Sequence, residues 1–135
     1  QQKRNDTEQC LINIHPEVKL EKFEGFGAAL TEATAASWMK LGDSKKEKLV
    51  AYFSADDGIG YTFGRILIHS CDFSISPYAY VENNDMTLES FDISREEIAV
   101  IPFIKAAGKL SSGLKIIASP WSPPPYMKNN GQWQG

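Results

Sequence analysis

Residues 65–73 read Arg65-Ile66-Leu67-Ile68-His69-Ser70-Cys71-Asp72-Phe73, an apolar run that ends abruptly in a carboxylate. Consecutive aliphatic residues without alternation are typical of a parallel strand covered on both faces, although so short a run also fits a buried helical segment. In parallel α/β proteins, the residues just after such a strand carry the chemistry. Asp72 is therefore the first candidate functional residue, with a loop-capping carboxylate as the alternative.

Length and composition set the broad class. The chain has 135 residues, of which 42% are hydrophobic and 23% are charged, and this is enough for one domain with a real core. A net charge of −3 argues against nucleic acid or an anionic membrane surface as the main partner. No apolar run approaches the roughly 18 residues of a spanning helix, and no signal-peptide pattern opens the chain. Because the chain runs from Gln1 to a loop-like stretch at Gly135, we expect both ends to be cuts.

Two cysteines, Cys10 and Cys71, are too few for a disulfide framework. Cys71 ends an apolar strand, so we interpret it as a small buried hydrophobe, with a reactive thiol or a disulfide partner as alternatives. Asn5-Asp6-Thr7 fits the glycosylation sequon, a pattern that is common by chance and compatible with a secretory route.

Further strands are expected on either side of the central one. Residues 11–20 contain short strand-like pieces, residues 23–30 form a glycine-rich strand where another backbone passes close, and residues 114–118 form a third buried strand. The order of strand, helices, strand, helix and strand predicts a parallel sheet with right-handed crossovers.

Three helices are expected between these strands: residues 31–41, a helix from residue 44, and residues 94–110. Thr31 can cap the first, and capping-box spacing pairs Ser44 with Glu47 and Ser94 with Glu97. The last helix must adjust at Pro102, which lacks an amide hydrogen. The long polar loop over 74–91 offers two candidate contact residues, Tyr78 and Tyr80.

Glycine motifs and histidines exclude two kinds of site. Neither Gly25-Phe26-Gly27 nor Gly58-Ile59-Gly60 meets the dinucleotide fingerprint, and neither leads to a Lys-Ser/Thr pair, so a bound nucleotide is not expected. His15 and His69 lie far apart without metal-ligand spacing. We therefore expect no cofactor and no metal.

Acidic and aromatic residues follow all three strands. They are Thr31 and Glu32, then Asp72 and Phe73, then Trp121 and Tyr126. A carboxylate can accept hydrogen bonds from neighbouring sugar hydroxyls, and an aromatic ring can cover the apolar face of a pyranose. This mixture favours a sugar site, although a single tryptophan such as Trp121 also fits a core position.

Three motifs carry a family resemblance: residues 25–32 (Gly-Phe-Gly-Ala-Ala-Leu-Thr-Glu), residues 65–74 and residues 118–124 (Ala-Ser-Pro-Trp-Ser-Pro-Pro). In this order and spacing, they resemble the opening motifs of family 30 glycoside hydrolases, most closely the glucosylceramidases. The resemblance covers roughly residues 20–131. It implies an α/β fold in which residues 23–135 supply the first three βα units of a (β/α)₈ TIM barrel. Residues 1–22 would contribute strands to a β-sandwich side domain.

The resemblance also implies roles for residues of this chain. Asp72 and Trp121 match residues that bind the terminal glucose, with Phe73 and Tyr126 as further substrate-binding candidates. Arg65 matches an arginine that supports the carboxylate of the nucleophile. Pro125-Tyr126 stands where the family often has Ala-Trp, which changes the pocket rim. No glutamate of this chain matches either catalytic glutamate, so both are expected on later strands of a barrel that needs about 250 residues.

The resemblance implies a retaining β-glucosidase, inactive as this chain alone, that acts on a glycolipid such as glucosylceramide. An endo-β-1,6-glucanase of the same family, a non-catalytic carbohydrate-binding module and a plain α/β structural domain are the alternatives. The expected partner is a glucoside, either glycolipid or β-glucan, with contact to a lipid surface but no stable insertion. The family implies a secreted, periplasmic or lysosomal location.

Overall fold

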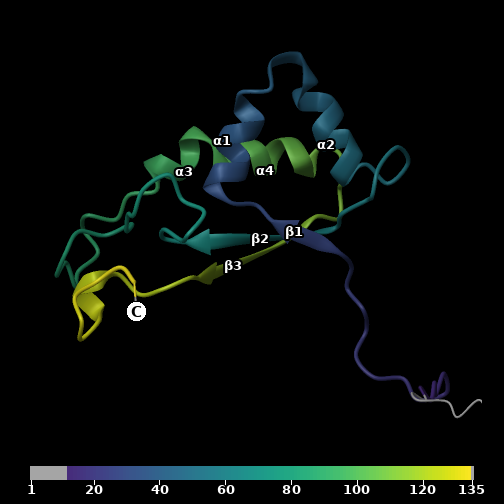
Figure 1. Cartoon of the computed structure of the whole chain (residues 1–135), viewed down its shortest axis with the longest axis horizontal. Coiled ribbons are helices and arrows are strands. Elements are labelled where there is room, and N and C mark those ends of the chain that lie inside the picture. Colours follow the sequence, from purple (N-terminus) through teal and green to yellow (C-terminus); the bar gives the residue numbers. More distant parts are fainter. Residues whose placement is uncertain (1–11, 135) are drawn as a thin grey trace, which may run out of the picture.

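A computed structural model describes residues 12–134 (Figure 1). Cys10, the Asn5 sequon and the first half of the 1–22 segment lie outside the described residues. The elements are β1 (Gly27–Ala29), α1 (Glu32–Met39), η1 (Gly42–Ser44), α2 (Lys45–Phe53), β2 (Phe63–Ile68), α3 (Ser94–Ile98), α4 (Val100–Gly108), β3 (Lys115–Pro120) and η2 (Pro125–Met127). The three strands form one parallel sheet in the order β1-β2-β3, as the sequence predicts.

The strand register explains where the strands begin and end. Phe63 pairs with Gly27 on one side and with Lys115 on the other, so β2 begins before Arg65. At its other end, Ile68 pairs with Pro120, and His69 then leaves the strand with a φ of 66°. Because the strands are parallel, the carboxyl ends of β2 and β3 meet at the same edge of the sheet.

Two glycines allow the close packing of this sheet. A Cβ on Gly27 would lie 1.7 Å from the carbonyl oxygen of Phe63, which confirms the close backbone approach predicted there. A Cβ on Gly64 would lie 2.8 Å from the terminal methyl groups of Leu30 and Ile116. Gly27 has no room for a side chain, whereas a side chain at Gly64 would require the ends of Leu30 and Ile116 to shift.

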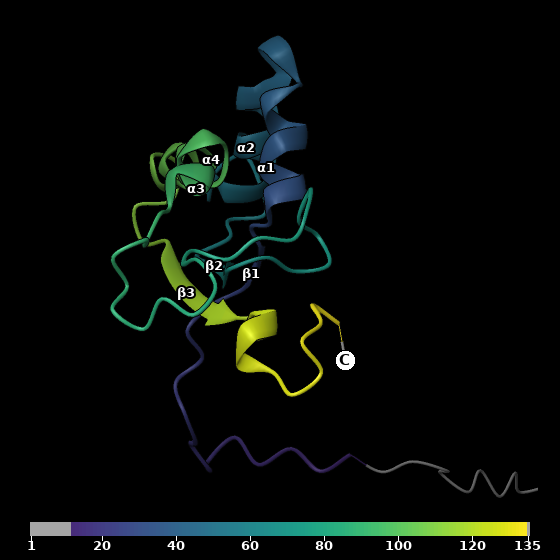
Figure 2. The ribbon, with the colours of Figure 1, turned by 90° about the vertical axis from the view of Figure 1, so that its left-hand side faces the viewer.

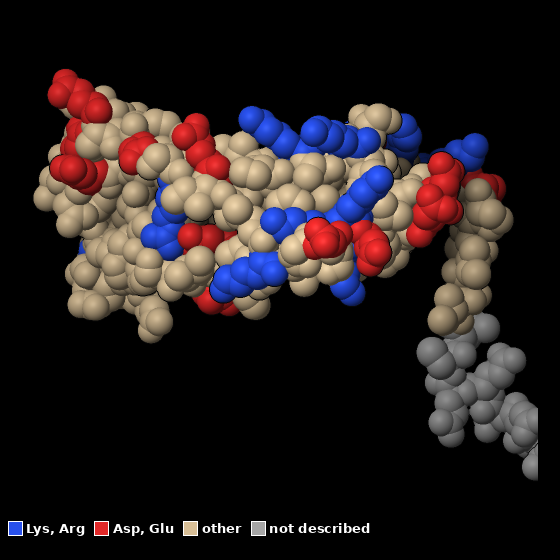
Figure 3. Space-filling view, turned by 90° about the horizontal axis from the view of Figure 1, so that it is seen from above, with Lys and Arg blue, Asp and Glu red and all other residues tan. Residues whose placement is uncertain are grey.

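Helices α1, α2 and α4 cover one face of the sheet (Figure 2). Aromatic contacts join them: the ring of Phe103 lies 5.3 Å from that of Trp38 and 6.3 Å from that of Phe53. The buried core consists of Leu30, Ala35, Leu49, Phe53, Ala99, Val100, Phe103 and Ala107. Seen from above, the molecule carries both signs of charge, with acidic side chains gathered towards the two ends of the view and others between them (Figure 3).

The predicted capping of the first helix is confirmed, because the hydroxyl of Thr31 accepts a hydrogen bond from the Thr34 amide at 3.3 Å. The predicted capping box at Ser44 is wrong. The hydroxyl of Ser44 donates to the carbonyl of Leu41 at 2.9 Å and makes no cap hydrogen bond to α2. The first helix ends at Met39, and the backbone turns through Gly42 with a φ of 56°.

The capping box at Ser94 is also wrong. The Ser94 amide and hydroxyl both donate to the carboxylate of Asp92, at 2.7 Å and 2.8 Å, and α3 has no side-chain cap hydrogen bond. The expected adjustment at Pro102 is confirmed as a break at Ala99, where φ is −136°. Pro102 cannot donate to the carbonyl of Ile98, and its ring would clash with that carbonyl in a continuous helix.

The strand-like pieces predicted within residues 11–20 are not found in residues 12–22, which form no strand. Their apolar side chains are exposed: Ile12 is 79% and Leu20 is 87% accessible. A strand needs a neighbour for its backbone hydrogen bonds, and this segment pairs with no part of the described chain. The sheet face opposite the helices is also open, and Ile117 is 49% exposed.

Candidate functional site

The turn that follows β2 fixes the position of Asp72. The Ser70 amide donates to the carbonyl of Tyr78 at 3.1 Å, and Ser70 itself is buried. The Cys71 amide donates to the hydroxyl of Ser74 at 3.0 Å, and the Ser74 amide returns a 3.1 Å bond to the carbonyl of Cys71. These bonds close a tight turn with Asp72 on its outside.

Asp72 and Trp121 line one pocket of about 320 Å³ at the carboxyl ends of β2 and β3. The expectation that they share one edge of the sheet is therefore met. The pocket is completed by Ser70, Cys71, Pro77, Ser122, Trp133 and Gln134. Among the described residues that line it, Asp72 is the single carboxylate, and two indoles accompany it.

Arg65 connects the sheet to this pocket. Its Nε donates to the hydroxyl of Ser119 on β3 at 2.9 Å, and its guanidinium lies 5.5 Å from the centre of the Trp121 ring. The pair is close enough for a cation–π attraction, which holds the indole against the end of the sheet. Arg65 therefore contacts both Ser119 of β3 and Trp121, a residue that lines the pocket.

Phe73 and Tyr126 do not line this pocket. The Phe73 carbonyl accepts a hydrogen bond from the Ala33 amide at 3.1 Å, which ties the turn to α1, and its ring is 59% exposed. Tyr126 lies within η2 and is partly buried. Phe73 directly follows Asp72 in the sequence, but only Asp72 lines the pocket.

Trp133 and Gln134 were missed by the sequence analysis, although both line the pocket. Trp133 comes 12 residues after Trp121 and follows no strand, so the strand-end argument could not reach it. The available signal was an aromatic residue in a polar, glycine-flanked loop, Gly131-Gln132-Trp133-Gln134.

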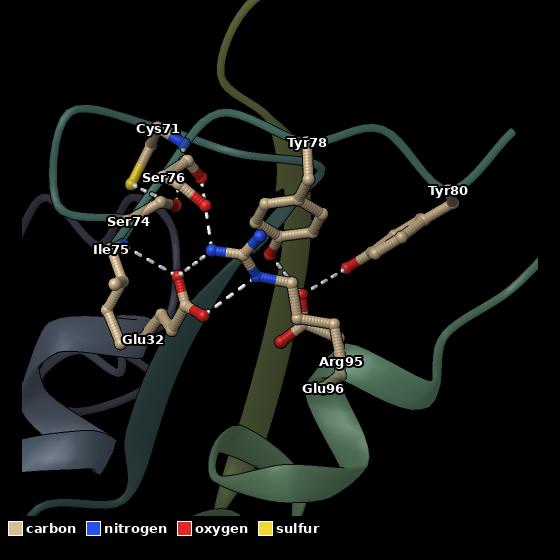
Figure 4. A network of polar contacts seen from close by, with 9 residues as sticks. All are labelled: Glu32, Cys71, Ser74, Ile75, Ser76, Tyr78, Tyr80, Arg95 and Glu96. Atoms are coloured by element: carbon tan, nitrogen blue, oxygen red, sulfur yellow. Dashed lines mark hydrogen bonds and ion pairs between the residues drawn. The ribbon is translucent and has the colours of Figure 1, made fainter. Parts of the chain in front are cut away.

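Beside the pocket, Glu32 and Arg95 form a second polar group (Figure 4). Arg95 Nε donates to Glu32 Oε1 at 2.8 Å, and its Nη2 donates to Oε2 at 3.0 Å. The Ile75 amide donates to the same carboxylate at 2.8 Å, and Arg95 also donates to the carbonyl of Ser76 at 3.1 Å. Burial alone raises the pKa of Glu32, but the hydrogen bonds from Arg95 and Ile75 and the charge of Arg95 outweigh it, so the pKa lies below its usual 4.5.

Tyr78 and Tyr80, the candidate contact residues of the loop, serve the fold. Both hydroxyls donate to Oε1 of the buried Glu96, that of Tyr80 at 2.9 Å (Figure 4). Burial and the neighbouring carboxylate raise the pKa of both phenols far above the usual 10. His69 accepts the Tyr80 amide at Nδ1 at 3.0 Å, and burial lowers the pKa of its imidazole.

The pocket has the chemistry of a carbohydrate site. One carboxylate can accept sugar hydroxyls, and indoles can cover the apolar face of a pyranose. Among residues 12–134, no group of three or more His, Cys, Asp or Glu side chains is placed to hold a metal ion. Three parallel strands with helices on one face and a pocket at their carboxyl ends define this chain as an α/β protein.

The comparisons identify the family. The profile of the glycosyl hydrolase family 30 TIM-barrel domain matches residues 23–135, and the chain belongs to this family. Over 128 residues it is 38% identical to lysosomal acid glucosylceramidase of Mus musculus. Over 135 residues it is 31% identical to endo-1,6-beta-D-glucanase of Neurospora crassa. The crystal structure of SrfJ from Salmonella typhimurium superposes with a TM-score of 0.79 at 39% identity.

These alignments span most of this chain but a small part of each relative. They cover 93% of this chain and 25% of the mouse protein, 97% and 28% for the fungal protein, and 86% and 26% for SrfJ. None of the helices in the described part of the chain is both long and apolar enough to span a membrane.

Proposed function

We propose that this chain is the glucose-binding part of a retaining β-glucosidase of the glucosylceramidase type. The observation that carries the proposal is the pocket shared by Asp72 and Trp121 at the ends of β2 and β3, in a chain of a glycoside hydrolase family. Asp72 accepts hydrogen bonds from two hydroxyls of the terminal glucose. Trp121, held by Arg65, covers the apolar face of the ring.

The catalytic carboxylates come from the rest of the barrel. A retaining hydrolase needs an acid/base and a nucleophile about 5 Å apart. The part of the pocket described here has a single carboxylate, so both glutamates are assigned to later strands. Arg65 supports the carboxylate of the nucleophile, and the contact of its guanidinium with Trp121 at the edge of the pocket supports this assignment.

The open surfaces of the chain support the same assignment. The open face of the sheet becomes the interior of the closed barrel, and residues 1–22 join a β-sandwich side domain. The exposed side chains Ile12, Ile14, Val18 and Leu20 would find their cover there. The mouse relative is lysosomal by name, which supports a lysosomal or secreted location and a glycolipid substrate at a lipid surface.

An endo-β-1,6-glucanase is the second candidate, because the Neurospora crassa relative of that name aligns with 97% of this chain. It would bind a glucan chain across the same pocket. A separate carbohydrate-binding module is disfavoured by the match to a TIM-barrel hydrolase domain over residues 23–135.

The test uses the full-length protein that contains this chain, incubated with glucosylceramide in mixed micelles and with β-1,6-glucan. We expect glucose and ceramide from the first, with β-glucose as the first anomer seen by NMR. Release of oligosaccharides from β-1,6-glucan without glucosylceramide cleavage would favour the second candidate. Initial α-glucose would contradict a retaining mechanism.

A further inference from the structure

We propose that Trp133 determines leaving-group specificity by forming the aglycone-side wall of the pocket. This inference rests on the proposed function, in which Asp72 and Trp121 bind the terminal glucose. Trp133 lines the same pocket as both residues, and 37% of the residue is exposed to solvent.

The chain builds a specific support for Trp133. Lys128 Nζ donates to the hydroxyl of Ser122 and to the carbonyl of Trp133, both at 3.3 Å. Asn130 adds two bonds, one from its Nδ2 to the carbonyl of Gln134 at 3.1 Å and one to its Oδ1 from the Gln132 amide at 3.0 Å. The turn between them uses Gly131 with a φ of 61°. Lys128 therefore connects the Trp133 turn to Ser122, which itself lines the pocket.

The two tryptophans that line the pocket are held in place by different parts of the chain. Trp121 directly follows β3, and the guanidinium of Arg65 from β2 lies 5.5 Å from the centre of its ring. Trp133 is held by residues that follow β3, and the C-terminal segment curls back beyond the end of that strand (Figure 2). Trp133 therefore forms a wall of the pocket that is supported separately from Trp121.

The place of Trp133 in the pocket and the flat apolar surface of its indole together indicate which leaving groups it would contact. A glucose held by Asp72 and Trp121 leaves Trp133 as the remaining aromatic wall of the described pocket for the leaving group. An indole offers a flat apolar surface, which gains most from another ring, either a second sugar or an aryl group. A small leaving group such as methyl would not reach it. Trp133 should therefore discriminate between leaving groups and leave glucose binding unchanged.

The experiment compares Trp133→Ala with wild type in the full-length enzyme, using gentiobiose and 4-nitrophenyl β-glucoside as ring leaving groups. The inhibition constant Ki of 1-deoxynojirimycin, a glucose mimic without a leaving group, reports on glucose binding by Asp72 and Trp121 alone. We expect kcat/KM for both ring substrates to fall roughly fivefold to fiftyfold, the range for truncating an aromatic anchor, while Ki changes less than about twofold. Trp133→Phe should recover most of the loss, and Lys128→Met should reproduce part of it.

Met127→Ala is the matched control, because Met127 is an exposed apolar residue of the same segment that does not line this pocket. This substitution should leave both kcat/KM for the ring substrates and Ki for 1-deoxynojirimycin unchanged. Equal losses in kcat/KM and inhibitor affinity would place Trp133 in the glucose subsite and overturn the inference, as would no loss at all. Either result would leave the proposed function standing, provided that the wild-type enzyme cleaves β-glucosides. A wild-type enzyme that cleaves no β-glucoside would overturn both the proposed function and the inference about Trp133.

Discussion

Arg95 holds Glu32 through two hydrogen bonds, at 2.8 Å and 3.0 Å, although the two residues lie 63 positions apart in the chain. The pair joins α3 to the first turn of α1, and the same two side chains bind the backbone of Ile75 and Ser76. The loop that leads from Asp72 to Pro77 is thereby fastened between two helices. Both ends of this loop, Asp72 and Pro77, line the pocket.

Removing Arg95 should destabilise the protein. Arg95→Met would leave the Glu32 carboxylate, whose side chain is 10% exposed, with the Ile75 amide as its remaining partner. We expect a loss of about 1–3 kcal/mol in the free energy of unfolding, measured in urea with the full-length protein. The double variant with Glu32→Met should recover part of this loss, because no charge is then left unpaired. Equal stability of wild type and Arg95→Met would contradict the account.

The same pair predicts a pH dependence. The pKa of Glu32 is lower in the folded protein than its ordinary 4.5, so the stability it contributes is present above pH 4.5 and is lost as the pH falls through the folded pKa. Melting temperatures of wild type and Glu32→Gln should therefore differ most near neutral pH and converge in acid. A difference between the two proteins that is independent of pH would argue against an ionised Glu32.

Close packing at Gly64 gives a prediction with a control inside the chain. A methyl group at residue 64 would meet Leu30 and Ile116 at 2.8 Å, whereas one at Gly113 would meet nothing within 4 Å. Gly64→Ala should lower the free energy of unfolding by about 1–3 kcal/mol, the usual cost of overpacking. Gly113→Ala should change it far less. Similar effects of the two substitutions would show that the space around Gly64 is not limiting.

The sequence predicted those features that depend on local patterns. Three apolar runs were enough to place the parallel strands, and the residue types after them were enough to bring Asp72 and Trp121 to one edge. The capping boxes at Ser44 and Ser94 failed because each hydroxyl found an acceptor on its N-terminal side, at Leu41 and Asp92. Spacing alone cannot rank two such competing acceptors.

Contacts between residues far apart in the chain could not be predicted from the sequence. The pairing of Glu32 with Arg95 depends on how α1 and α3 pack, and no periodicity encodes it. Trp133 reaches the pocket through a glycine turn and a lysine bridge, which leave no pattern of their own. Tyr78 and Tyr80 looked like surface contact residues until the buried Glu96 gave their hydroxyls a partner.

The most direct test of the glucose-binding account is the kinetics of Asp72→Asn in the full-length enzyme, measured together with its melting temperature. The asparagine keeps the shape of the side chain but removes the charge and turns one acceptor into a donor. Hydrogen bonds to a charged group are worth roughly 1.5–3 kcal/mol each, so kcat/KM for a β-glucoside should fall by about tenfold to several-hundredfold with little change in melting temperature. A variant with a lowered melting temperature and wild-type kcat/KM would contradict the account, because Asp72 would then act only as a cap of its loop.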